Sequence, residues 1–248
     1  MNEIQKQKEN YFQEKNGNAS LVKELLVRTS PCQKVNQGKS KSCHFIDFRR
    51  AFQSSIHVYI IYLLETSNLL EQNDNGVSEL MKAAEEGNLE KVKSLVEEGK
   101  RLEVVGDLID MKSDEGRSAL WESCSNGHNE VARYLLDNKA DVNSSNNDGL
   151  TPLHMASWYG HEAVVQTLLE NNASVDEQDF DGDTPLLNAC RYKHLSIVKL
   201  LTKHQADINK RNEEGEGPIS FLWDDDKSKE ILQYLKRHQE ENESKLSP

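Results

Sequence analysis

The feature that most constrains this chain is a set of residue columns that recur every 33 residues from Gly116 onward. The patterns SALW, TPLH, TPLL and GPIS begin at Ser118, Thr151, Thr184 and Gly217. Further columns keep this register: Gly116, Gly149, Gly182 and Gly215; His128, His161 and His194; Leu120, Leu153, Leu186 and Ile219; Val131, Val164 and Ile197; Ala132, Val165, Val198 and Ile231. Self-similarity at a period of this length indicates stacked structural repeats.

An earlier copy of the pattern begins at Ser78, 40 residues before the next copy. We place its extra length, seven residues, at Lys100–Gly106 (KRLEVVG). The predicted units are 74–113, 114–146, 147–179, 180–212 and 213–240.

Each unit has the signals of two short helices joined by a turn. Thr151 suits a helix N-cap, and Pro152 at the first helical position loses no useful N–H. In the second helix of the same unit, apolar residues at 164, 165, 168 and 169 form one face. Helices this short are marginal alone, so they must stack on neighbouring units and share a continuous core.

These columns resemble the ankyrin repeat family. The third unit, DGLTPLHMASWYGHEAVVQTLLENNASVD, resembles the family pattern almost throughout, and the second and fourth are good matches. The first unit lacks TPLH, and the last has Leu222 and Trp223 where small residues are usual and Asp226-Lys227 in place of Gly-His. The resemblance implies an all-α solenoid of stacked helix-turn-helix units with short hairpin turns. It also implies a non-catalytic protein–protein interaction module, a scaffold or adaptor.

Charge and apolar content exclude several other classes of protein. The formal net charge is −12, and residues 76–248 carry all of the acidic excess, with 20 Lys and Arg against 34 Asp and Glu. Nucleic acid is therefore an unsuitable partner, because phosphate binding needs clustered cations. The longest apolar run, Ile56–Leu64, is far shorter than the ~20 residues of a membrane helix. Without a signal sequence, we expect reduced cysteines and a location in the cytoplasm or nucleus.

The two ends of the chain lie outside the repeats. Residues 1–73 read as a partly disordered segment, with FIDFRRAFQSSIHVYIIYLLETSNLLEQ apolar enough to form a helical cap or a docking segment. Residues 241–248 read as a disordered tail.

Residues that suggest chemistry have simpler explanations in the repeat register. Residues 176–188 partly fit a calcium loop, but Asn188 at position 12 cannot supply a bidentate carboxylate, and Gly182 is explained by a turn. The histidine column places its members about 10 Å apart, too far to share one zinc ion. Cys124 and Cys190 lie two repeats apart, too far for a disulfide. Recognised nucleophile and phosphate-binding motifs are missing from the sequence, so we expect no enzyme activity, no metal and no cofactor.

The resemblance also places the binding residues, at the hairpin turns and just before each Gly-His. Among these positions the aromatic and arginine side chains, which dominate interface hot spots, are Arg117, Trp158, Tyr159, Phe180, Arg191 and Tyr192. The corresponding positions at the two ends are mostly acidic: Asp74, Asn75, Glu85 and Glu86 in the first unit, and Glu213, Glu214, Glu216, Asp224 and Asp225 in the last. This pattern fits a protein partner that is apolar in the centre and basic at its flanks. We expect the chain itself to be a monomer. The competing interpretation is that the aromatics pack between repeats and the acids only solvate the surface.

Two further expectations follow from the resemblance. Asn143 and Asn209 occupy a turn position that is open to asparaginyl hydroxylation in proteins of this type, where Asp110 and Asp176 stand in other units. As an alternative function, the array could be the substrate-recognition subunit of an enzyme complex such as a ubiquitin ligase, docked through residues 1–75.

Overall fold

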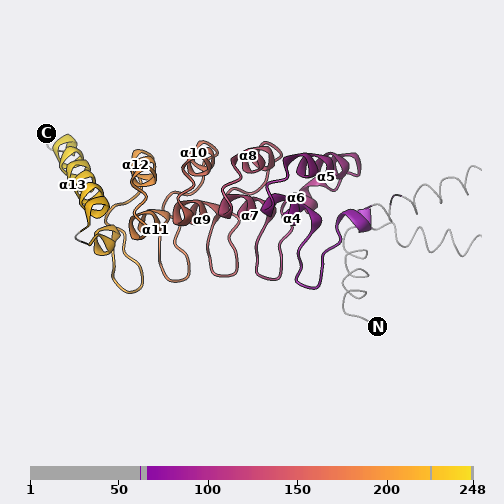
Figure 1. Ribbon diagram of the computed structural model, residues 1–248, viewed down its shortest axis with the longest axis horizontal. Helices are drawn as coiled ribbons and strands as arrows, with labels where there is room; N and C mark the ends of the chain where they lie inside the picture. Colours follow the sequence, from indigo (N-terminus) through magenta and orange to yellow (C-terminus); the bar gives the residue numbers. More distant parts are fainter. Residues whose placement is uncertain (1–61, 63–65, 224, 247–248) are drawn as a thin grey trace, which may run out of the picture. The chain divides into compact units, whose positions relative to one another are not determined.

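The computed structural model describes residues 62, 66–223 and 225–246, all within the second of two units of the chain, Ser54–Pro248. Its helices are paired and stack sequentially, as the repeat register predicts (Figure 1). One layer contains α4 (Glu79–Glu85), α7 (Ala119–Ser125), α9 (Pro152–Tyr159) and α11 (Pro185–Arg191). The second layer contains α5 (Leu89–Arg101), α8 (Asn129–Asp137), α10 (Glu162–Glu170) and α12 (Leu195–Lys203). The fold is an all-helical solenoid.

A hydroxyl side chain begins each helix of the first layer. The Oγ atoms of Ser78, Ser118, Thr151 and Thr184 each accept a hydrogen bond from the backbone N–H three residues later. Gly217 occupies this position in the last unit and has no side chain to cap a helix. There the first helix is reduced to a single 3-10 turn, η1 (Pro218–Phe221), followed by α13 (Asp226–Leu246).

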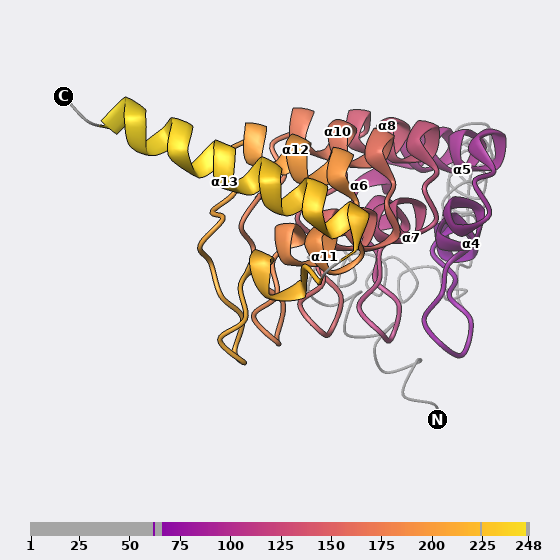
Figure 2. The ribbon, with the colours of Figure 1, turned by 60° about the vertical axis from the view of Figure 1, so that its left-hand side comes forward.

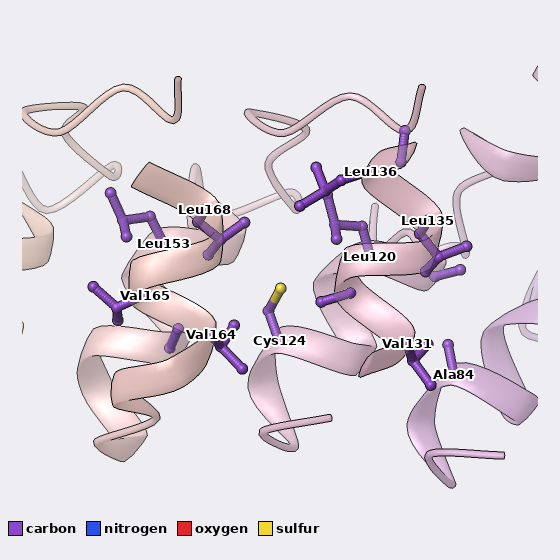
Figure 3. Packing of buried hydrophobic residues seen from close by; sticks show 14 of the residues in the cluster. Ala84, Leu120, Cys124, Val131, Leu135, Leu136, Leu153, Val164, Val165 and Leu168 are labelled. Atoms are coloured by element: carbon purple, nitrogen blue, oxygen red, sulfur yellow. The ribbon is translucent and has the colours of Figure 1, made fainter. Parts of the chain in front are cut away.

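The core is one continuous apolar layer between the helices. Leu120, Leu153 and Leu186 are each at most 1% exposed, so the predicted leucine row is buried. The β-branched and alanine columns of the second helices are buried as well, from Val131 through Ile231. Figure 3 shows part of this packing in the second and third units. Ile219, at the end of the leucine row, differs because it is 48% exposed.

The extra length of the first unit is divided between two elements. Helix α5 has 13 residues, whereas α8 has nine, so part of the insertion extends this helix. The remainder forms a separate short helix, α6 (Val105–Ile109), whose Leu108 and Ile109 are buried. The inserted residues thus add Leu102, which is 2% exposed, to the core of the first unit, and Val104 and Val105 pack against it partly buried.

Helix α13 continues past the predicted end of the last unit at residue 240. It reaches Leu246, within the segment for which the sequence predicts a disordered tail. Glu, Lys and Leu in this stretch are good helix formers and neither Gly nor Pro interrupts it, which accounts for the longer helix. Most of the predicted N-terminal cap or docking segment lies outside the described residues. Within the described part of the chain, every helix is too short or too polar to span a bilayer.

Candidate functional site

The acidic hairpin turns are closed by their own side chains. The Oδ1 atom of Asp179 accepts hydrogen bonds from the backbone N–H groups of Asp181 (3.1 Å) and Asp183 (2.8 Å). Asn146 and Asn212 make the same kind of bond in the neighbouring units. Asx residues commonly close turns in this way. The described residues contain no His, Cys, Asp or Glu cluster suited to a metal ion.

Backbone hydrogen bonds connect each hairpin to the next. The N–H groups of Asp114, Asn147, Phe180 and Glu213 donate to carbonyl oxygens of the preceding hairpin, each at 3.0 Å. The hairpins therefore form a row whose side chains have fixed relative positions. A partner that contacts several hairpins meets a preorganised surface, which lowers the entropic cost of binding.

The histidine column packs on glycines of the preceding unit. The Nε2 atoms of His128, His161 and His194 lie 2.9–3.1 Å from backbone carbonyl oxygens of that unit. A Cβ atom added at Gly160 would lie 2.6 Å from the His194 ring, and Gly127 faces His161 in the same way. Gly160 also has a φ of +83°, which favours glycine. The Gly-His pattern is thus an inter-unit contact in which each histidine occupies the space left by a glycine.

His154 connects the third unit to the fourth from within the core. Its ring is fully buried, and Nε2 lies 3.1 Å from the carbonyl oxygen of Asp183. Because a carbonyl can only accept, Nε2 carries the proton and Nδ1 accepts from Thr151 N–H. Burial lowers the pKa of His154 to about 4. In the second unit Trp121 replaces this histidine, and its indole N–H donates to Leu150 O at 2.9 Å.

The two proposed hydroxylation positions have different surroundings. The Oδ1 atom of Asn143 accepts a hydrogen bond from Ser174 N–H of the next unit at 2.9 Å, and Asp110 and Asp176 make the equivalent bond. Asn209 is exposed, and its side chain has no hydrogen-bond partner within residues 66–223 and 225–246. After Asn209 the chain enters the last unit, where α13 stays helical and forms no equivalent turn.

If an asparaginyl hydroxylase acts on this chain, we expect Asn209 to be modified to a higher fraction than Asn143. The side chain of Asn209 is exposed, so the enzyme can reach it without breaking an inter-unit hydrogen bond. Quantitative mass spectrometry of protein isolated from cells that contain such an enzyme provides the measurement. Equal occupancy, or modification of Asn143 alone, would contradict the expected order.

Three aromatic side chains from the third and fourth units form the aromatic cluster, Trp158, Tyr159 and Tyr192. The rings of Trp158 and Tyr192 stack with centroids 4.9 Å apart and planes 26° from parallel. Tyr159 lies 6.5 Å from Trp158. Trp158 is partly buried, but Tyr159 and Tyr192 are 53% and 41% exposed. The cluster therefore packs between units and still presents an aromatic surface to solvent.

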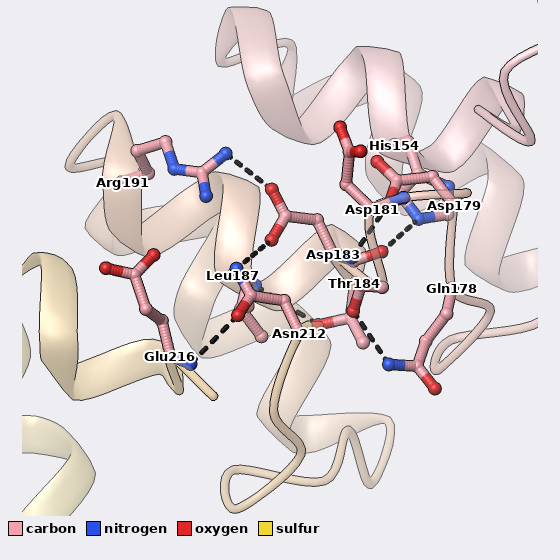
Figure 4. Close-up of polar contacts among 11 residues, drawn as sticks. His154, Gln178, Asp179, Asp181, Asp183, Thr184, Leu187, Arg191, Asn212 and Glu216 are labelled. Carbon is pink, nitrogen blue, oxygen red and sulfur yellow. Dashed lines mark hydrogen bonds and ion pairs between the residues drawn. The ribbon is translucent and has the colours of Figure 1, made fainter. Parts of the chain in front are cut away.

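Arg191 is held within the chain. Its guanidinium pairs with Asp183 and lies over the ring of Phe221 at 4.2 Å. Asp183 is nearly buried and also accepts a hydrogen bond from Asn212 at 2.9 Å (Figure 4). These contacts link the fourth unit to the last one. Arg191 is therefore largely engaged in an internal network beside the aromatic cluster.

Arg117 and Phe180 stand apart from this cluster. Arg117 pairs with Glu115 at 2.6 Å and with Glu122 at 3.6 Å, and it lies over the ring of Trp121. Burial raises the pKa of Glu122, and the neighbouring Arg117 only partly counteracts this rise. Phe180, on a hairpin, is 70% exposed and makes no ring contact within the described part of the chain. The six predicted residues thus form one compact group of three, with Arg191 beside it and two outliers.

One predicted surface acid is used internally. The carboxylate of Asp225 accepts hydrogen bonds from Lys193 Nζ at 2.6 Å and from Ser228 Oγ at 2.7 Å, near the start of α13. These partners, Lys193 first, hold the pKa of Asp225 well below its usual range. Asp225 is therefore less available to a basic partner than the exposed Glu213 and Glu214.

Two exposed apolar side chains were not among the predicted binding residues. Trp223 is 75% exposed and Ile219 is 48% exposed, and both belong to the last unit. For Trp223 the sequence signal was the departure of residues 222–223 from the small residues expected there, whereas Ile219 fits its apolar column and gave no signal. By contrast, Cys124 and Cys190 are buried, and burial raises the pKa of each thiol to about 12, so neither is a reactive nucleophile.

Stacked helix pairs joined by hairpins define a repeat protein, and comparison with known proteins gives its family. A family model described as ankyrin repeats (3 copies) matches residues 100–179, and a second, ankyrin repeats (many copies), matches residues 159–202. The chain is an ankyrin repeat protein. Ankyrin repeats are protein-binding modules.

Two curated relatives match a shorter stretch. Protein phosphatase 1 regulatory subunit 27 of Homo sapiens is 36% identical over 78 residues, which is 32% of this chain and 46% of the relative. The Mus musculus protein of the same name matches to the same extent. The match therefore spans about half the length of these relatives.

Proposed function

We propose that this chain is a non-catalytic scaffold or adaptor that binds a partner protein through the concave face of its third and fourth units. The aromatic cluster is the observation that carries the proposal. Trp158 and Tyr192 are fixed by stacking across two units, so they lose little conformational entropy on binding. Rigid aromatic side chains with exposed surface are the type that supplies most of the energy of protein interfaces.

The charge around the cluster supports a partner with basic flanks. Exposed carboxylates occur on every hairpin of the array, at Asp74, Asp114, Glu115, Asp148, Asp181, Glu213 and Glu214. Arg117 offsets Glu115, and Arg211 lies in the last hairpin, where it donates to Gly215 O. The hairpins at 144–150 and 177–183 contain no arginine or lysine. Complementary charge at the rim of an interface mainly accelerates association and selects among partners. The partner segment would place an apolar side chain on the cluster and basic residues toward the hairpins.

Truncating the aromatic cluster should weaken binding strongly. Trp158→Ala and Tyr192→Ala are each expected to cost about 2 kcal/mol, roughly thirtyfold in affinity, because each removes half of the stacked pair. The partner is first identified as a protein captured by the wild-type chain and lost with the double variant. The affinity of each purified variant for this partner is then measured by calorimetry, with folding checked by thermal melting.

Two control variants make this test specific. Trp223→Ala removes an equally large exposed side chain from the last unit and should leave the affinity unchanged. Glu213→Ala should mainly reduce the association rate and its dependence on salt. If both cluster variants stay folded and bind like the wild type, the cluster is not the binding centre.

A second candidate is regulation of a protein phosphatase. The supporting observation is the 36% identity over 78 residues to protein phosphatase 1 regulatory subunit 27. The purified catalytic subunit of protein phosphatase 1 is the appropriate probe. Direct binding that Trp158→Ala weakens would unite the two candidates, whereas no binding at micromolar concentration would exclude the phosphatase.

A further inference from the structure

The carboxamide of Asn188, in α11, is buried without a partner. The residue is 0% exposed, yet neither Oδ1 nor Nδ2 has a hydrogen-bond partner in the described part of the chain. At the equivalent positions of the second and third units, Glu122 pairs with Arg117, and Met155 is apolar. A buried amide without hydrogen bonds lowers stability, so its presence calls for a role outside the fold.

Two other buried polar atoms without a partner, Arg117 Nε and Ser157 Oγ, have simpler explanations. The terminal nitrogens of Arg117 form ion pairs, so the guanidinium as a whole is paired. Ser157 shares a core column with Cys124 and Cys190, where its hydroxyl replaces a thiol. Among the described residues, Asn188 is the one buried side chain in which both a donor and an acceptor are unfilled.

The ring of Tyr192 covers this amide from the same helix. Tyr192 follows Asn188 by four residues, and its backbone N–H donates to Asn188 O at 3.0 Å. Residues four apart lie on the same face of a helix. A long side chain on a helix leans over the preceding turn, which places the Tyr192 ring above Asn188.

The repeat register places Trp158 over the amide from the preceding unit. Arg191 and Phe221 stand 33 residues after Trp158 and Asn188, and the Arg191 guanidinium lies over the Phe221 ring at 4.2 Å. Because each unit contacts the next in the same way, Trp158 lies over Asn188. The Trp158 and Tyr192 rings also stack with centroids 4.9 Å apart, so together they close the amide off from solvent.

We propose that Asn188 binds the main chain of an extended partner segment once the Trp158–Tyr192 pair has opened to admit it. Since the amide lies beneath the aromatic cluster, this assignment rests on the proposed function and names the group that the cluster recognises. A carboxamide presents a donor and an acceptor side by side. The N–H and C=O of one extended residue point to the same side and match both. Opening breaks the ring stack, and the two new hydrogen bonds fill the groups that the fold leaves unfilled.

The charges around the amide suit a segment that also carries basic residues. Figure 2 shows the hairpins along one edge of the array, below α7 and α11. The hairpins at 144–150 and 177–183, which lead into α9 and α11, carry carboxylates and no arginine or lysine. The basic residues at the end of α11, Arg191 and Lys193, are already paired with acids of this chain. An extended segment directs alternate side chains to opposite faces, so some can meet the aromatic rings while others reach the hairpins.

The probe is a peptide that the purified wild-type chain selects from a phage-displayed library of short random peptides. Asn188→Met is the test variant, since Met155 occupies the equivalent position of the third unit and is buried there. The variant should melt at the wild-type temperature or higher, because the unfilled amide is gone, and should bind the peptide about tenfold more weakly. Ser157→Cys removes the neighbouring unpaired hydroxyl and should leave the affinity unchanged.

The outcomes separate this assignment from the proposed function. Unchanged affinity of Asn188→Met overturns the assignment, whereas the proposed function stands if Trp158→Ala still weakens binding. If every selected peptide binds Trp158→Ala like the wild type, the proposed function itself fails. A lower melting temperature for Asn188→Met would show that the amide serves the fold, which also contradicts the assignment.

Peptides in which one backbone N–H at a time is replaced by an ester oxygen test for main-chain recognition. One such ester should weaken binding to the wild type about tenfold and have no effect on Asn188→Met, because Asn188 makes the hydrogen bond that the ester removes. If only truncation of an asparagine or glutamine side chain in the peptide shows this coupling, Asn188 binds a side chain, and the main-chain assignment is wrong. Absence of coupling at every peptide position would overturn it as well.

Discussion

Replacing Gly160 with alanine is expected to lower the free energy of unfolding by about 3 kcal/mol. The left-handed backbone conformation contributes about 1–2 kcal/mol for a residue with a Cβ atom. The new Cβ would also lie 2.6 Å from Cε1 of His194 in the next unit, and overpacking of this kind costs about 1–3 kcal/mol. Urea denaturation followed by helical circular dichroism provides the measurement.

The chain contains a matched control for the backbone part of this cost. Gly215 has a φ of +79°, but a Cβ atom added there meets no other atom within 4 Å. Gly215→Ala should therefore cost only about 1 kcal/mol. The same small cost is expected for Gly160→Ala in a chain that already carries His194→Ala, because the ring no longer occupies the space. Equal effects of Gly160→Ala with and without His194 would show that the contact is unimportant.

A natural exception supports this account of the Gly-His pairs. The fourth unit has Lys193 where the second and third units have Gly127 and Gly160, although Lys193 also has a positive φ, 63°. The last unit has no histidine to occupy the space, and Lys193 instead pairs with Asp225 at 2.6 Å. The two departures from the pattern, at Lys193 and at Asp226-Lys227, are thus related.

The sequence predicts the periodic parts of the fold well because each unit repeats the same local chemistry. Thr151 and Thr184 cap helices, and Leu120, Leu153 and Leu186 are buried, as their columns indicate. A column shows only the residue type that recurs at a position, however. It does not reveal a unit in which a different side chain makes the same contact. Trp121 donates the hydrogen bond that His154 donates one unit later, and no pattern search for histidine would find it.

The candidate site was harder to predict because its side chains have competing partners. The sequence treats Arg191 and Asp225 as exposed binding residues, whereas the fold pairs them with Asp183 and Lys193. Those partners lie 8 and 32 residues away, and only the turn geometry brings them close. The exposure of Ile219 also depends on the fold, since the same apolar column is buried wherever another unit follows.

Acidification is expected to remove about 3 kcal/mol of stability through His154 alone. Burial in the fold lowers its pKa from 6.5 to about 4. Below pH 6.5 the unfolded chain takes up a proton that the folded chain cannot accept, so stability falls as the pH falls toward 4. Below about pH 4 the folded form is protonated as well, and the contribution ends. One pKa unit corresponds to about 1.4 kcal/mol. The lowering of the His154 pKa from 6.5 to about 4 therefore gives the loss of about 3 kcal/mol.

A His154→Leu variant isolates this contribution from the other groups that titrate in acid. Leucine already occupies the equivalent position in the fourth unit, as Leu187, so the site accepts it. At pH 7 the variant should be about 1–2 kcal/mol less stable, because the hydrogen bonds to Asp183 O and Thr151 are lost. Between pH 6.5 and 4 the wild type should lose its advantage, and the two stability curves should cross. Urea denaturation at each pH gives the free energy of unfolding of both proteins. If the two free energies change in parallel across this range, His154 is protonated as easily in the folded chain as in the unfolded one, contrary to its burial.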